Sequence, residues 1–121
     1  MHARRETAQR MLLLVGRDLH EAERVRRLLP ARVGIAHAPS QAVRALHRTD
    51  VVLLEDRNWP SAEDEALSEL RDLSTARRLA LILSRRRGDV GDPAAVPVVE
   101  RPYRIEEIIS AMRLALLRRL A

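Results

Sequence analysis

The chain has 121 residues, 46% of them hydrophobic and 32% charged, which fits one globular domain with a single core. It has no cysteine, so disulfides, a thiol nucleophile and a cysteine-based zinc site are excluded, and no apolar run is long enough for a membrane span or a secretory signal. The net charge is +5 and all 22 basic residues are arginines, but they are spread among 17 acidic residues rather than gathered in one segment. We therefore expect a cytoplasmic protein without a cofactor, with neither a membrane nor nucleic acid as its partner.

Short apolar runs alternate with helical patterns along the chain. The runs predict five strands, over residues 11–15, 33–36, 51–55, 79–84 and 97–100. Apolar residues at helical spacing predict helices over residues 20–29, after Ser40, over 61–77 and over 104–120. Ser40 is expected to cap the second helix, and Ser61 with Asp64 has the spacing of a capping box at the start of the third. Residues 1–10 are expected to form an N-terminal extension and residues 11–121 the domain.

Strands that alternate with helices predict an α/β fold, in which a doubly wound parallel sheet has right-handed crossovers and helices on both faces. In such a sheet, ligands bind at the carboxyl ends of the strands. Gly16 stands alone after the first strand, so neither a dinucleotide fingerprint nor a phosphate-binding loop is present. The candidate site residues at this edge are Gly16, Arg17, Asp18, Glu55, Asp56, Ser84, Glu100 and Arg101.

Three segments in order, DVVLLED, LALILS and ERPYRIEEIISAMRLAL, make the region from Met11 to Leu120 resemble the receiver domain of two-component response regulators. The resemblance implies a flavodoxin-like topology with strand order 2-1-3-4-5. It also implies that Ser84 takes the place of the receiver's hydroxyl residue, and that Arg101 and Tyr103 take the places of its lysine and following aromatic residue. The segment between Ser84 and Arg101 contains two glycines and two prolines, which predicts a short or missing fourth helix.

The chain departs from the receiver pattern where that pattern carries its chemistry. Receivers hold Mg²⁺ with an acidic pair and a phosphoacceptor aspartate, but Gly16 and Arg17 stand where the pair would be, so no metal is expected. The strand register puts Glu55 in the place of the phosphoacceptor, while the spacing to the following proline favours Asp56. Val98 stands where many receivers carry a switching aromatic residue. These departures indicate a pseudo-receiver without catalytic residues.

A cation is still needed near two neighbouring carboxylates, because like charges oppose joint ionisation. Arg17 and Arg101 follow strands that flank the third strand or lie near it, so at least one guanidinium is expected to pair with Glu55 or Asp56. A solvated Arg17 is the plain alternative. Ser84 is expected to bond with backbone groups rather than to act as a switch.

The last helix has a wider apolar arc than a surface helix needs, because Leu114, Leu117 and Leu120 extend its buried stripe. We expect these leucines, with Trp59 and Tyr103, to belong to a protein interface, and we expect a homodimer. Two alternatives stay open: the leucines pack on the first helix and the N-terminal extension, and Trp59 covers the core locally.

Three functions follow from these observations. The first is a receiver-like regulatory module that acts by protein contact and without phosphorylation. The second is a single-domain response regulator that accepts phosphate on Asp56 or Glu55. The third is a binder of nucleic acid or a small anionic ligand at the arginine-rich crevice, which a steep salt dependence of binding would reveal.

Overall fold

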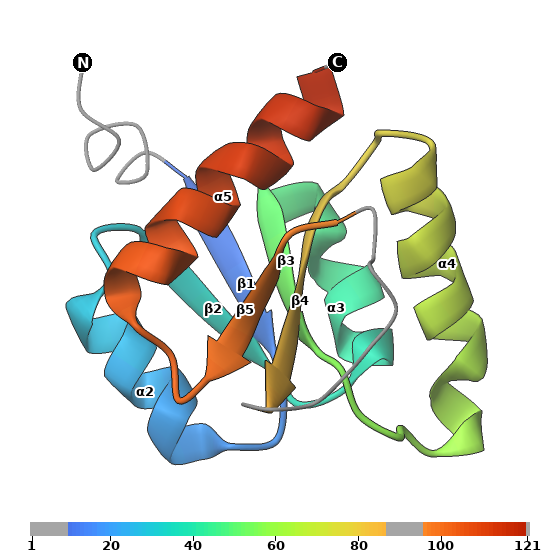
Figure 1. Ribbon diagram of the computed structural model, residues 1–121. Coiled ribbons are helices and arrows are strands. Elements are labelled where there is room, and N and C mark those ends of the chain that lie inside the picture. Colours follow the sequence, from blue (N-terminus) through green and yellow to red (C-terminus); the bar gives the residue numbers. More distant parts are fainter. Residues whose placement is uncertain (1–9, 87–95, 121) are drawn as a thin grey trace.

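The computed structural model describes residues 10–86 and 96–120, and its centre is a parallel sheet with helices on both faces (Figure 1). The sheet has five strands in the order β2-β1-β3-β4-β5. The strands are β1 (Met11–Val15), β2 (Arg32–Ala36), β3 (Val51–Glu55), β4 (Ala80–Arg86) and β5 (Val98–Arg101). This confirms the predicted fold class and strand order.

Four α-helices and two short 3₁₀ turns accompany the described strands, and the last helix follows β5. The helices are α2 (Leu19–Leu28), α3 (Pro39–Ala45), α4 (Asp64–Thr75) and α5 (Ile105–Leu120), and the turns are η1 (Leu46–Arg48) and η2 (Ser61–Glu63). Helices α2 and α5 cover one face of the sheet, while α3 and α4 cover the other (Figure 1). The predicted N-terminal extension lies almost wholly outside the described residues, and so do residues 87–95, where a short or missing helix was expected.

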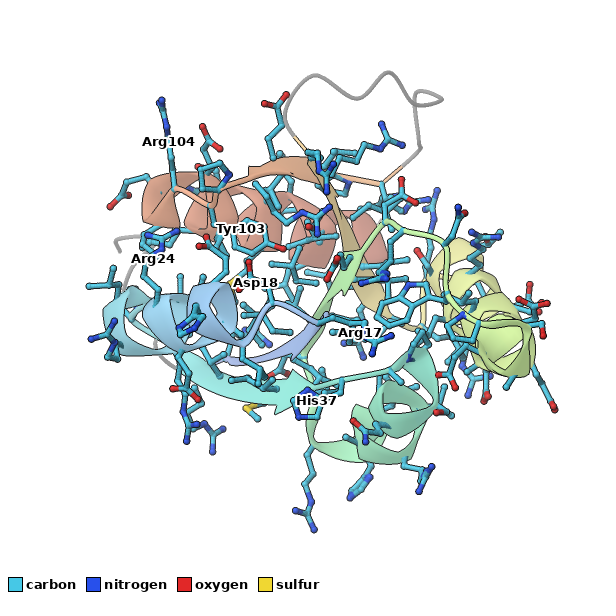
Figure 2. All side chains as sticks on the ribbon, turned by 90° about the horizontal axis from the view of Figure 1, so that it is seen from below. Arg17, Asp18, Arg24, His37, Tyr103 and Arg104 are labelled. Carbon is cyan, nitrogen blue, oxygen red and sulfur yellow. The ribbon has the colours of Figure 1, made fainter. Side chains whose placement is uncertain are left out.

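All five strands run the same way, so their carboxyl ends meet at one edge of the sheet, which Figure 2 shows end-on. The central strand β3 is buried along its whole length because both faces are covered, which explains its continuous apolar sequence. At its end Glu55 is aligned with Ser84 of β4. Val15 of β1 is aligned with Leu54, so Gly16 and Arg17 leave β1 beside Glu55.

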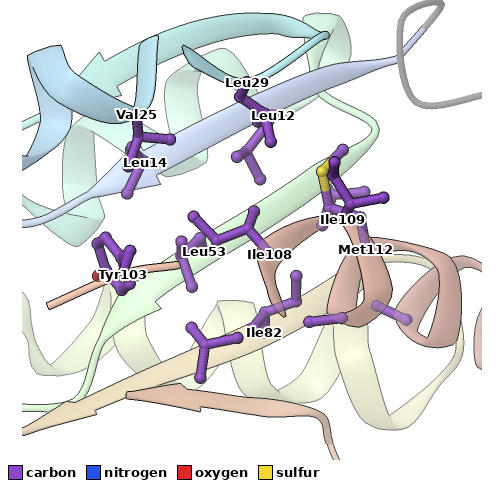
Figure 3. Packing of buried hydrophobic residues seen from close by; sticks show 14 of the residues in the cluster. Leu12, Leu14, Val25, Leu29, Leu53, Ile82, Tyr103, Ile108, Ile109 and Met112 are labelled. Carbon is purple, nitrogen blue, oxygen red and sulfur yellow. The ribbon is translucent and has the colours of Figure 1, made fainter. Parts of the chain in front are cut away.

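Alternation along the strands sends side chains to two separate cores. The larger core lies between the sheet and helices α2 and α5, with Leu53, Ile82, Ile108 and Met112 fully buried in it (Figure 3). The smaller core lies under α3 and α4 and includes Leu70. Burying a leucine or isoleucine stabilises the fold by about 1.5–3 kcal/mol, so these two layers set the position of the strand ends.

The two helix caps that were predicted from serines, Ser40 and Ser61, differ from the structure. Ser40 lies inside α3, whose N-cap residue is Ala38, and Ser61 lies in η2 rather than capping α4. The Ser40 backbone N–H and hydroxyl instead donate to the Glu63 carboxylate, at 2.8 and 3.1 Å. Glu63 thus satisfies free donors in the first turn of α3 from a distance of 23 residues along the chain, and local sequence spacing does not reveal such a contact.

Helix α2 begins one residue earlier than expected, because Asp18 is its N-cap. The Asp18 side chain accepts a hydrogen bond from the Glu21 backbone N–H at 3.0 Å.

Among the described residues, no helix is both long and apolar enough to span a membrane.

Candidate functional site at the carboxyl edge of the sheet

Glu55 lies at the centre of the candidate site, and its carboxylate is held from within the chain. Its Oε1 atom is 2.6 Å from Nη1 of Arg101 and 3.7 Å from Nη1 of Arg57. Its Oε2 atom accepts a hydrogen bond of 2.9 Å from the Arg17 backbone N–H. Only 11% of the Glu55 side chain is exposed, so this carboxylate is removed from water and both of its oxygens have donors.

Gly16 makes room for this arrangement. A Cβ atom added at Gly16 would lie 2.5 Å from Oε2 of Glu55 and 3.5 Å from its Cβ, and the first of these distances is well inside van der Waals contact. Glycine at the end of β1 and glutamate at the end of β3 are therefore sterically matched. The sequence placed both residues at this edge but did not show that one needs the other.

The expectation that a guanidinium pairs with Glu55 is confirmed for Arg101 but not for Arg17. The Arg17 side chain is exposed (Figure 2), and it reaches Glu55 only through its backbone N–H. Within residues 10–86 and 96–120, no ion pair of the Arg17 side chain is seen. The plain alternative, a solvated Arg17, is therefore correct for its guanidinium.

The two aspartates expected at this edge have separate roles. Asp18 points to the start of α2 as its cap. Asp56 has a side chain that is 46% exposed, and its Oδ2 is 3.1 Å from Nε of Arg85. Its backbone N–H donates to the Ser84 carbonyl at 2.7 Å, so the β3–β4 pairing continues past the strand end. An open crevice here is lined by Glu55, Asp56, Arg57, Asn58, Arg86 and Arg101.

Ser84 and Tyr103 form a buried pair. The Tyr103 hydroxyl donates to Oγ of Ser84 at 2.6 Å, and the exposed fractions are 6% for Tyr103 and 0% for Ser84. Two expectations are corrected here. Ser84 bonds with a side chain rather than the backbone, and Tyr103 packs inside the larger core, so its ring is not available to an interface.

The backbone of Tyr103 is tied to α2. Its N–H donates to Oε1 of Glu21 at 2.8 Å, and its carbonyl accepts a hydrogen bond from Arg24. Arg24 also pairs with Glu21 at 2.5 Å, and this hydrogen bond lowers the pKa of the Glu21 carboxyl. The peptide bond between Arg101 and Pro102 is cis. The hydrogen bonds from Tyr103 to Glu21 and from Arg24 to Tyr103 hold the segment that follows Arg101 against α2.

Trp59 covers the smaller core at the edge of the crevice. Its ring is half-buried, its Nε1 donates to the Glu55 carbonyl at 3.1 Å, and the Arg57 guanidinium lies 5.3 Å from the ring centroid. The alternative of a local cover therefore fits the structure better than an interface anchor.

Sequence analysis missed Glu21, Arg24, Arg57 and Arg85. The i,i+3 spacing of Glu21 and Arg24 on one helix was a visible signal for their own pair. Their hydrogen bonds with the Tyr103 backbone cross 82 and 79 residues of sequence, and local spacing does not reveal them. In the described part of the chain, no group of three His, Cys, Asp or Glu residues is arranged to hold a metal ion.

Burial of the Tyr103 phenol leads to a testable pH dependence. Removal from water disfavours the phenolate and raises the pKa of Tyr103 to about 12, from 10.0. The unfolded chain therefore releases this proton first, so stability is intact below pH 10 and falls between pH 10 and pH 12, by up to about 2–3 kcal/mol. Tyr103 is the only tyrosine, so ultraviolet absorbance reports its titration directly. A midpoint near 10 in the folded protein would contradict the burial of the phenol, and Tyr103→Phe is the control without the titration.

The architecture now described is that of receiver domains. A receiver domain protein from Clostridium thermocellum aligns with a TM-score of 0.72 at 17% identity, over 93% of this chain and 98% of that one. A putative pilus assembly-related protein from Burkholderia pseudomallei aligns with a TM-score of 0.69 at 17% identity, over 93% and 92%. A probable two-component response regulator with a GGDEF domain aligns with a TM-score of 0.75 at 18% identity, over 97% of this chain but 53% of that one.

No protein-family model and no curated protein sequence matches the chain. At these identities the likeness establishes the receiver fold.

Proposed function

We propose that the chain is a receiver-like regulatory module that acts by protein contact and does not accept phosphate. The observation that carries the proposal is that groups of the same chain already bind both oxygens of the Glu55 carboxylate. The carboxylate in the phosphoacceptor's place receives a guanidinium at 2.6 Å and a backbone N–H at 2.9 Å from its own chain.

The chemistry of phosphoryl transfer explains why this arrangement argues against phosphorylation. A carboxylate attacks phosphorus through a free oxygen, and a divalent ion neutralises the phosphoryl oxygens. Arg101 and the Arg17 N–H engage both oxygens of Glu55, and Gly16 and Arg17 provide no carboxylate from β1 to hold an ion. The permanent charges of Glu55 and Arg101 thus keep the site in one state. A phosphoryl group, which can be added and removed, does not switch it.

Asp56 supports the second candidate, a phosphate-accepting regulator, because its carboxylate is the more exposed of the two. Its pairing with Arg85 at 3.1 Å and its place beyond the strand end favour a structural role.

Protein contact is supported by the apolar residues that β5 and α5 expose. Two of the similar structures carry the same fold beside a GGDEF domain, so in those proteins the fold is one domain of a larger chain.

The test treats the protein with Mg²⁺ and either acetyl phosphate or beryllofluoride. We expect an unchanged intact mass and no large amide shifts at Glu55, Asp56 and Ser84. A phosphate-accepting receiver domain treated in the same way is the positive control. A gain in mass would contradict the proposal, and its loss in Asp56→Asn would establish the second candidate instead.

A further inference from the structure

The crevice at the carboxyl edge of the sheet, the edge that Figure 2 shows end-on, holds more positive charge than its carboxylates balance. Both carboxylates that line it already have a guanidinium close by. Nη1 of Arg101 lies 2.6 Å from Oε1 of Glu55, and Nε of Arg85 lies 3.1 Å from Oδ2 of Asp56. Arg57 only shares Glu55 with Arg101, at 3.7 Å. A concave site with an excess of one charge concentrates ligands of the opposite charge.

The strand register adds a second cation without a counter-charge. Arg86 of β4 and Arg101 of β5 are aligned partners, and aligned residues of neighbouring strands direct their side chains to the same face of a sheet. Like charges in this arrangement destabilise a sheet. Glu55 compensates Arg101, whereas no ion pair of the Arg86 side chain is seen in residues 10–86 and 96–120. An anion placed between the two guanidiniums would remove their repulsion.

Two guanidiniums of the crevice are held in place before any ligand binds. Arg101 is bonded to Glu55 and its side chain is 21% exposed, while the Arg57 guanidinium lies over the Trp59 ring, 5.3 Å from its centroid. Donors that are already ordered lose less conformational entropy on binding. Arginine and tryptophan are also enriched among the residues that contribute most to binding at protein interfaces. The crevice has a volume of about 390 Å³, which leaves room for the acidic side chains of a partner segment.

We propose that this crevice binds an acidic segment of a partner protein, with glutamate or aspartate carboxylates placed between Arg57, Arg86 and Arg101. A guanidinium binds a carboxylate through two parallel, charge-assisted hydrogen bonds. A nucleic acid fits the crevice less well, because Glu55 and Asp56 interrupt the continuous positive surface that a phosphate backbone requires. The inference rests on the proposed function, since it names the chemistry of the protein that is contacted.

Binding of fluorescein-labelled hexaglutamate, followed by fluorescence anisotropy at low salt, tests the proposal. We expect saturable binding of hexaglutamate and none of hexaglutamine labelled in the same way. Arg57→Gln and Arg86→Gln should each weaken binding roughly 10-fold, because each removes one charged donor. Arg26→Gln is the matched control, since it removes the same charge from α2, where that side chain is 57% exposed, and it should change binding less than about twofold. Circular dichroism checks that each variant is folded.

Several outcomes would overturn the proposal. They are no saturable binding at millimolar hexaglutamate, equal binding of hexaglutamine, and equal effects of Arg86→Gln and Arg26→Gln. Tighter binding of a short oligothymidylate or of inorganic phosphate that depends on Arg57 and Arg86 would also overturn it, by identifying a different ligand. A chain that does not bind hexaglutamate but resists phosphorylation would overturn only this inference. A chain that binds hexaglutamate and accepts phosphate would overturn only the proposed function.

Discussion

Arg101→Ala is expected to lower the free energy of unfolding by about 2–4 kcal/mol. Removing one partner of a buried ion pair leaves the other charge without compensation, which costs about 3–5 kcal/mol when burial is complete. The Arg101 side chain is 21% exposed and that of Glu55 is 11% exposed, so water that enters at the truncated side chain reduces the loss. Urea unfolding followed by circular dichroism measures the change.

Arg17→Ala is the matched control, because Arg17 also lies beside Glu55 but contacts it through the backbone. We expect its effect to stay within about 0.5 kcal/mol, as for other surface substitutions. The double variant Arg101→Ala/Glu55→Ala should lose less than the sum of its single variants, since neither charge is then left buried alone. Equal stability of the Arg101→Ala and Arg17→Ala proteins would show that the pair does not hold the crevice.

Gly16→Ala is expected to cost about 1–3 kcal/mol, although only one methyl group is added. The new Cβ would meet Oε2 of Glu55 at 2.5 Å, and overpacking of a filled site typically costs this much. A carboxylate oxygen at the end of a free side chain would move away, but Glu55 is fixed on both sides by Arg101 and the Arg17 N–H. Relief of the contact requires at least one of these bonds to lengthen.

Repeating the glycine substitution without the carboxylate separates this steric cause from a general backbone effect. In a Glu55→Ala background, Gly16→Ala should be neutral or stabilising by up to about 1 kcal/mol, because alanine reduces the entropy of the unfolded chain. The unfolding free energies of the four proteins form a double-mutant cycle, and we expect a coupling of at least about 1 kcal/mol. An equal cost of Gly16→Ala in both backgrounds would refute the steric match between Gly16 and Glu55.

Local patterns determined the sheet and placed Glu55, Asp56 and Arg101 at the crevice. The strand at 51–55 was predicted with its observed bounds, because a strand covered on both faces must be apolar throughout. Glu55, Ser84 and Arg101 could be assigned to one edge because the carboxyl ends of parallel strands lie at the same edge of the sheet. This assignment does not depend on the directions of their side chains. The alternation of strands and helices restricted the topology in the same way.

Tertiary structure alone decided which groups meet at that edge. Sequence position made Arg17 and Arg101 equal candidates for the Glu55 carboxylate, but β1 presents the backbone of Arg17 to it and β5 presents the guanidinium of Arg101. Tyr103 turned inward to Ser84 because the segment around it is tied to α2 by Glu21 and Arg24. These contacts depend on side-chain directions that are set by packing between elements far apart in the chain. The sequence pattern within one element does not predict those directions.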